Sequence, residues 1–262
     1  MTLISALQLG SIDYATGLRL QERLVQLRKQ GSIGDVLLLL EHAPVITLGR
    51  NAKTRNILVS PEELAQRGVE VFECNRGGDV TFHGPEQLVA YPIFDLHGFA
   101  SKEAKRQTMG AVEFVRRLEE VLIRTCRHFG VATERVVGLT GVWTRAREAE
   151  EQAKIAAIGV HISRGVTSHG FALNVNTDLD FFNLIVPCGI ASKPVTSIQK
   201  ELRRRVELTE VIPVVESAFA EVFETEIERV ASLEALTRPT GVPMKPPAEL
   251  RRLHKEEESY WA

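Results

Sequence analysis

A short, uninterrupted apolar run near the N-terminus is the feature that most limits how this chain can fold. Residues 35–40 read DVLLLL, and the stretch from Glu41 to Pro44 then supplies a turn signal. An apolar run of this length without polar alternation is typical of a strand covered on both faces. Residues 45–48, closed by Gly49, predict a second strand. The chain therefore needs packing layers on both sides of a sheet.

Apolar residues at three- and four-residue spacing predict helices over 13–31, 103–129 and 209–224, with Thr209 as the cap of the last. A short helix is expected over 60–68, where Ser60 caps the N-terminus and Glu63 completes a capping box. Strands are expected over 69–74, 154–160 and 166–176, the last two paired around residues 163–165, with 144–152 as a charged loop. Strands and helices do not alternate strictly, so we predict an α+β fold with a mixed or mostly antiparallel sheet flanked by helices.

The length of 262 residues suits one large domain or two small ones. We expect a catalytic domain over 1–230 and a peripheral tail over 231–262, because 238–247 contains four prolines and 248–260 is a short, highly charged helix candidate. Three scattered cysteines, no membrane-length apolar run and no signal-like N-terminus predict a cytoplasmic location. The net charge of −2 argues against a nucleic-acid partner.

The segment from Arg76 to His83, RGGDVTFH, is the first candidate site. Adjacent glycines after a strand let the backbone approach a ligand closely, and Arg, Thr and His supply polar groups around the same turn. A plain β-hairpin with a glycine bend explains the pattern equally well. A phosphate-binding P-loop is excluded by the missing Gly-Lys-Ser/Thr, and a Rossmann loop by the missing third glycine.

Two further residues are candidates for chemistry. Lys154 opens an apolar strand, where an ammonium group is costly unless it is paired, functional or able to reach water from the strand end. Cys188 lies between Pro187 and Gly189 at a rigid turn, a setting that suits a nucleophile, although most cysteines are inert packing residues. Cys126 falls on the apolar stripe of a helix and Cys74 at a strand end, and both are expected to pack.

Together these motifs resemble the octanoyltransferases of the lipoyl pathway, the LipB family. The resemblance rests on RGGDVTFHGPEQLVAY from Arg76, on KIAAIGV with VTSHGFALNVN from Lys154, and on FFNLIVPCGI ending at Ile190, in that order. LLLLEHAPVITLGR from Leu37 also looks like the N-terminal strand pair of the family, and the similarity spans about residues 10–220. The chain departs from the family at Glu86, where Gly or His is usual.

The resemblance implies the fold of biotin–protein and lipoate–protein ligases, a mixed sheet with helices on its flanks. It implies Cys188 and Lys154 as the catalytic pair. The segments implied to bind the acyl group are Arg76, Gly77, Gly78, Asp79, Val80, Thr81, Phe82 and His83, then Ala157, Ile158 and Gly159, then Gly170, Phe171 and Ala172. Ile158, Phe171 and Leu173 are apolar strand residues suited to line an octanoyl tunnel. No cofactor and no metal are expected.

The implied reaction moves an octanoyl group from octanoyl acyl-carrier protein to a lysine ε-amine on a lipoyl domain. The acceptors implied are lipoyl domains of 2-oxoacid dehydrogenases and the glycine cleavage H protein. A Cys188 thiolate, favoured by a nearby Lys154 ammonium, would form an acyl-enzyme, and Lys154 or His83 would accept the proton of the attacking amine. The alternatives are an ATP-dependent lipoate or biotin ligase, an octanoyl amidotransferase between lipoyl domains, a non-catalytic acyl-binding protein and, least favoured, a metal site.

Overall fold

The computed structural model describes residues 3–103, 106–146, 151–187 and 193–236. Within these residues one eight-stranded sheet runs in the order β11-β1-β2-β6-β10-β9-β8-β7. The strand β1 pairs in parallel with β2 and β11, and the remaining pairs are antiparallel. The predicted mixed sheet is therefore confirmed. Its strands are β1 (Leu3–Ile12), β2 (Asp35–His42), β6 (Gln87–Ile93), β7 (Thr133–Val136), β8 (Leu139–Thr144), β9 (Lys154–Ser163), β10 (Val166–Asn174) and β11 (Glu226–Arg229).

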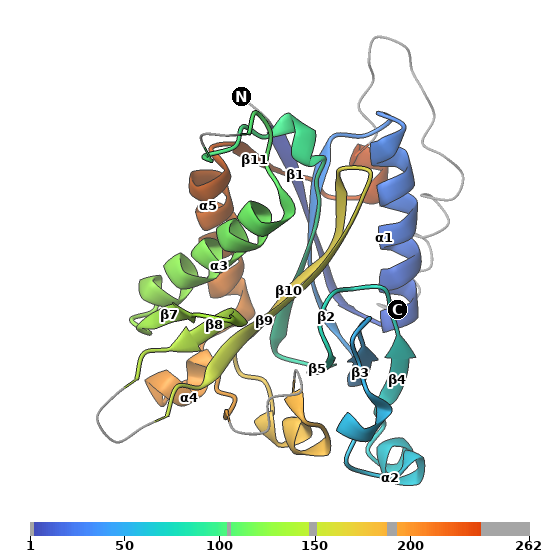
Figure 1. Cartoon of the computed structure of the whole chain (residues 1–262), viewed down its shortest axis with the longest axis vertical. Helices are drawn as coiled ribbons and strands as arrows, with labels where there is room; N and C mark the ends of the chain where they lie inside the picture. The colour runs from blue at the N-terminus through green and yellow to red at the C-terminus, as the bar shows by residue number, and fades with distance from the viewer. Residues whose placement is uncertain (1–2, 104–105, 147–150, 188–192, 237–262) are drawn as a thin grey trace.

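Helices cover both faces of this sheet (Figure 1). The helix α1 (Tyr14–Lys29) packs on one face, and α3 (Ala111–His128) and α5 (Leu208–Phe223) pack on the other. In β2, Leu37 and Leu39 belong to the core under α3 and α5, whereas Leu38 and Leu40 belong to the core under α1. The alternation of side chains along a strand explains why this run is apolar throughout.

A second, three-stranded sheet stands beside the large one. It has the order β4-β3-β5 and consists of β3 (Val45–Leu48), β4 (Glu70–Glu73) and β5 (Val80–His83). The strands β4 and β5 flank the Gly-Gly turn but do not pair with each other, because β3 lies between them. The turn is therefore not the bend of a simple hairpin. It crosses over a strand, and this crossing brings it against the large sheet.

The sequence places some helix ends wrongly. The helix α3 begins at Ala111 rather than near 103, because the Glu113 carboxylate accepts hydrogen bonds from Ser101 Oγ (2.7 Å) and the Lys102 N–H (3.0 Å), which holds the preceding segment across the first turn. The cap of α5 is Glu207, in a capping box with Glu210, and not Thr209.

In α2 (Pro61–Gln66), Ser60 caps the Glu63 N–H as predicted. The Glu63 carboxylate instead pairs with Arg67 at 2.9 Å, so only half of the expected capping box forms. The predicted 154–160 and 166–176 strands form the antiparallel pair β9–β10. The remaining elements are α4 (Ile198–Leu202) and short 3-10 turns at Thr54–Asn56, Leu96–Gly98, Leu179–Leu184 and Leu233–Leu236.

Packing continues to the end of the described chain. Leu233 and Leu236 are buried in the core under α1. The first residues of the tail expected over 231–262, residues 231–236, therefore pack on the domain, and the rest of it lies outside the described residues. Among the residues that are described, no helix is both long and apolar enough to span a membrane.

Candidate active site

The Gly-Gly turn is braced by the side chain that precedes it. The Arg76 guanidinium is buried and donates to Thr47 O (2.7 Å), Thr47 Oγ1 (2.8 Å) and Gly77 O (3.1 Å). Arg76 therefore ties the turn to β3. Besides lining the cavity, its guanidinium has a structural role, because it holds this wall of the site in place.

The same turn lies tightly against β9. The Gly77 N–H donates to Val160 O at 2.9 Å. A Cβ at Gly159 would come within 2.8 Å of Gly77 O, and one at Gly49 within 2.5 Å of Gly78 O. Both distances are shorter than those that real Cβ atoms show, so the turn can pack here only if both residues are glycine.

Most of the segments expected to bind the acyl group meet in one cavity. The expected residues that line it are Arg76, Gly78, Asp79, Thr81, His83, Ala157, Ile158, Gly159, Gly170, Phe171 and Ala172. Gly77, Val80 and Phe82 do not line it: Gly77 lies against β9, and Val80 and Phe82 are buried in the core of the small sheet. Side chains alternate across a strand, so when Thr81 and His83 face the cavity their neighbours face away. Of the apolar tunnel candidates, Leu173 is buried under α3 and α5 instead.

Four residues outside the expected set complete the walls of this site. Tyr14, Tyr91 and His169 line the cavity, and His42 lies behind it, where its Nε2 is 2.7 Å from Tyr91 Oη. His42 Nδ1 lies 2.9 Å from Ile12 O, which can only accept, so the His42 ring carries its proton on Nδ1 and Tyr91 donates to Nε2. Tyr14 stacks on His83 with ring centroids 6.2 Å apart. Because α1 supplies Tyr14, no local pattern links it to the Gly-Gly segment.

Burial keeps the histidines of this cluster neutral. Removal from water lowers the pKa of His42 to about 4. It lowers the pKa of His83 to about 3, with His42 and the positive charge of Arg76 adding to the effect. The pKa of His169 falls to about 3 for the same reasons, burial first and then Arg76. Arg76 and Asp79, the charged residues that line the cavity, both hydrogen-bond to the protein. The other lining residues are neutral, which suits an apolar ligand.

Lys154 lies in an adjoining cavity. It is 7% exposed, and its ammonium stands 4.7 Å from the centre of the Trp143 ring, so it does not extend to water from the strand end. The Lys154 cavity is also lined by Pro187 and shares Thr81, Ala157 and Ala172 with the first cavity. The two cavities are thus neighbours along the same wall.

Cys188 lies outside the described residues, immediately after Pro187. Cys126 is buried in the core, as predicted. Cys74 is half-buried, with its Sγ 3.5 Å from Leu48 O.

A chain of buried amides connects His83 with the Lys154 strand. His83 Nδ1 lies 2.8 Å from Gln87 Oε1, and Gln87 Nε2 donates to Asn174 Oδ1 at 2.9 Å. Asn174 Nδ2 donates to Thr196 O at 2.9 Å, and the Thr196 N–H donates to Lys154 O at 2.9 Å. The amide oxygen of Gln87 fixes the proton of His83 on Nδ1, so Nε2 keeps its lone pair.

Glu86 stands apart from both cavities. Its φ of 65° lies in the left-handed region that favours glycine. The Glu86 carboxylate binds Arg205 at 2.6 Å and Asn176 Nδ2 at 2.5 Å, and the Glu86 N–H donates to Glu41 Oε2 at 2.6 Å. These contacts hold the residue on the side away from the acyl-pocket walls, so it does not narrow them.

Comparison with known proteins agrees with this geometry. Residues 13–220 match the family model of the lipoyl protein ligase A/B catalytic domain. An octanoyltransferase of Koribacter versatilis is 59% identical over 256 residues, covering 97% of this chain and 98% of that protein. An octanoyltransferase of Acidobacterium capsulatum is 61% identical over 206 residues, covering 79% and 83% of the two chains.

Solved structures of similar shape are lipoate–protein ligases. The bipartite lipoate protein ligase of Thermoplasma acidophilum matches with a TM-score of 0.69 at 14% identity, covering 98% of this chain and 92% of that one. Lipoate-protein ligase A bound with ATP matches with a TM-score of 0.64 at 13% identity, covering 97% and 93%. At such low identities the likeness establishes the fold alone. The family model and the similar curated proteins show more than the fold. The chain belongs to the lipoyl protein ligase A/B catalytic-domain family, together with octanoyltransferases, and is an acyltransferase.

Proposed function

We propose that this enzyme transfers octanoyl from octanoyl acyl-carrier protein to a lysine of lipoyl domains through a thioester on Cys188, without ATP, in the cytoplasm. The observation that carries the proposal is the pair of adjoining cavities. One contains Lys154 and Pro187, the residue before Cys188, and the other is a cavity between strands whose lining is neutral apart from Arg76 and Asp79. A reactive end beside an apolar end is what a thioester with an eight-carbon chain requires.

In the first step the Cys188 thiolate attacks the thioester carbonyl of the donor, and the carrier-protein thiolate leaves and takes a proton from the Lys154 ammonium, which becomes a neutral amine. The Lys154 ammonium favours the thiolate, because an opposite charge nearby stabilises the ionised form. One thioester replaces another, so the step needs no external energy source. Within the fold, Lys154 is held by the bonds of its backbone to Pro194 and Thr196, at 2.8 and 2.9 Å.

In the second step the ε-amine of the acceptor lysine attacks the acyl-enzyme, an amide forms and the Cys188 thiolate leaves. The attacking amine must lose a proton. Lys154 is the better acceptor, because His83, with a pKa of about 3, holds a proton poorly at neutral pH. His83 is then a neutral wall of the acyl cavity, oriented by Gln87.

Intact-protein mass spectrometry after mixing with octanoyl acyl-carrier protein, without ATP, tests this function. We expect one octanoyl adduct that is lost in Cys188→Ala and discharged by added lipoyl domain. Cys126→Ala is the matched control, since its thiol is buried in the core and should leave the adduct in place.

Two other outcomes would point elsewhere. Modification of the lipoyl domain only when ATP and free octanoate or lipoate are supplied would indicate a ligase. Transfer of octanoyl from one lipoyl domain to another, with little use of the carrier protein as donor, would indicate an amidotransferase. A normal turnover of Cys188→Ser would overturn the thioester mechanism.

A further inference from the structure

A second, larger hollow lies beside the acyl cavity and shares one lining residue with it. This hollow, the side groove, has a volume of about 480 Å³ and lies between α1, the end of β4 and the β9–β10 hairpin. Leu18, Val25 and Val166 give it apolar walls. His169 lines both the acyl cavity and the side groove and is the only residue common to their linings among those described.

His169 is fixed in this position from the groove side. Its N–H donates to Gln21 Oε1 at 2.7 Å, and its ring Nε2 lies 2.7 Å from Asn75 Oδ1. Asn75 is exposed, on the connection between β4 and the Gly-Gly turn. The imidazole also stands edge-on to Tyr91, with ring centroids 6.3 Å apart at 88°. One backbone contact and two ring contacts thus hold His169 at the boundary.

Two features show that this boundary is not simply well-packed core. His169 has a φ of 55° within a strand, a conformation that side chains other than glycine adopt at a cost. Gln21 is 2% exposed and lines the groove, yet its Nε2 has no hydrogen-bond partner among the described residues. A strained residue and an unsatisfied donor at the junction of two hollows indicate a wall retained for its position.

The register places this wall far from the reactive end. His169 pairs with Val160, six residues beyond Lys154 along β9, which corresponds to about 20 Å. An extended acyl chain gains roughly 1.3 Å per bond, so eight carbons span roughly 10 Å and sixteen carbons roughly 20 Å. An octanoyl chain that starts beside Lys154 therefore ends before His169, whereas a sixteen-carbon chain reaches it.

From this geometry we propose that His169 closes the far end of the acyl cavity and excludes long-chain acyl donors, by keeping the cavity apart from the side groove. The inference rests on the proposed function and adds its selectivity for chain length. Removal of the imidazole joins the two hollows. A long chain then continues into the groove along Leu18, Val25 and Val166.

The test compares acyl-carrier proteins loaded with eight-, twelve- and sixteen-carbon chains, in wild type, His169→Gly and His169→Ala. The readout is the kcat/KM for sixteen-carbon chains divided by the kcat/KM for eight-carbon chains. This ratio does not depend on the fraction of active protein, because that fraction affects both values equally. We expect this ratio to rise at least tenfold in both variants. His169→Gly also suits the φ of 55°, which keeps a folded protein in the series.

Two further variants make the test specific. Asn75→Ala frees the ring without removing it and should raise the ratio by a smaller factor. His161→Ala is the control, because His161 lines the side groove but not the acyl cavity, and its ratio should stay at the wild-type value. A tenfold rise with His161→Ala would contradict the assignment to His169.

The outcomes separate the two proposals. If wild type transfers octanoyl but the ratio is unchanged in both His169 variants, the proposed role of His169 is wrong. It is also wrong if wild type uses sixteen-carbon chains as well as eight-carbon chains. No octanoyl transfer from the carrier protein by wild type would instead reject the proposed function.

Discussion

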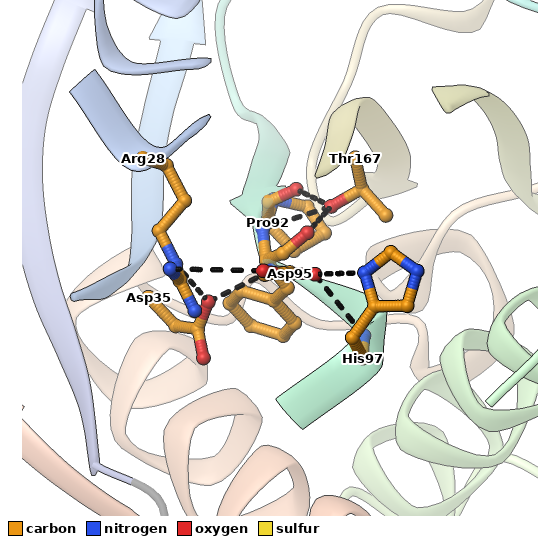
Figure 2. Close-up of polar contacts among 7 residues, drawn as sticks. Arg28, Asp35, Pro92, Asp95, His97 and Thr167 are labelled. Carbon is orange, nitrogen blue, oxygen red and sulfur yellow. Dashed lines mark hydrogen bonds and ion pairs between the residues drawn. The ribbon is translucent and has the colours of Figure 1, made fainter. Parts of the chain in front are cut away.

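The two ends of β2 carry polar clusters built on opposite electrostatic principles. At the start of the strand, Asp35 accepts from Arg28 Nε (2.7 Å) and from the Asp95 N–H (2.8 Å), and Asp95 in turn holds His97 Nδ1 at 2.8 Å (Figure 2). We call Arg28, Asp35, Asp95 and His97 the charged clamp. At the other end of the strand, His42 belongs to the uncharged cluster of Tyr14, His83, Tyr91 and His169 around the acyl cavity.

The difference reflects what each cluster has to do. The charged clamp joins the end of α1, the start of β2 and the segment after β6, so it ties elements that are distant in the chain (Figure 2). Thr167 beside it links β10 to the same segment, donating to Pro92 O and accepting from the Phe94 N–H. The uncharged cluster borders a cavity proposed for a hydrocarbon chain, where an ion without protein partners would raise the cost of excluding water. The charged residues that also line this cavity, Arg76 and Asp79, both hydrogen-bond to the protein.

A fall in pH should destabilise the uncharged cluster far more than the charged clamp, and this is the largest effect that we expect. The pKa values of His42, His83 and His169 are lowered to about 4, 3 and 3, so between pH 6.5 and about 4 the unfolded chain binds protons that the folded protein does not. Stability therefore falls as pH falls, by up to about 4 kcal/mol per pH unit if all three histidines contribute. Urea unfolding at several pH values measures this slope.

The clamp adds little in that window. Burial raises the pKa of Asp35, whereas for Asp95 the hydrogen bonds from His97 and the charge of Arg28 outweigh burial and lower the pKa. Protonation of Asp35 costs the folded state less than the unfolded state, and protonation of Asp95 costs it more, so the two effects oppose each other. His42→Asn should reduce the acid slope by about a third, and an unchanged slope would contradict the assignment to the histidines.

Removal of the acceptor at the clamp should have the next largest effect. Asp35→Ala leaves the Arg28 guanidinium and the Asp95 N–H without the oxygen that accepts from both, and it should lower the free energy of unfolding by about 3 kcal/mol. The matched control is Glu63→Gln, which breaks the exposed pair with Arg67 and should cost less than about 0.5 kcal/mol. The chain-length preference of the enzyme should not change in Asp35→Ala, and a changed preference would show that the clamp reaches the site.

A smaller effect is expected from the uncharged cluster. Tyr91→Phe removes the hydroxyl that donates to His42 Nε2 and should cost about 1 kcal/mol, because one neutral buried acceptor loses its partner. Urea unfolding at pH 7.5 measures the loss. A cost equal to that of Asp35→Ala would show that the two clusters do not differ in this respect.

Much of the fold follows from local patterns. The apolar run of β2, the pairing of β9 with β10 and the cap of α2 by Ser60 are all as predicted, because each depends on residues close in the chain. The start of α3 is not, since Glu113 binds groups that precede the helix. The patterns also leave out the small sheet, in which β3 separates two strands that flank the Gly-Gly turn.

The site divides in the same way. The motifs around Arg76, Lys154 and Cys188 indicate the family, because residue types and their order carry that information. Alternation along β5 would also have shown that Val80 and Phe82 face away from the cavity. Local patterns give no reason for Tyr14 or His42 to be at the site, since both reach it from elements far from the motifs.

The sequence alone thus determined the class of fold, the family and most of the segments that meet at the cavity. Only the tertiary structure decided that Arg76 braces a turn, that burial holds three histidines neutral, that Glu86 binds Arg205 outside the cavity, and that His169 lines both the cavity and a neighbouring groove. The physical reason is that a residue's type is local, whereas its burial, its partners and the space beside it are set by segments that are distant in the chain.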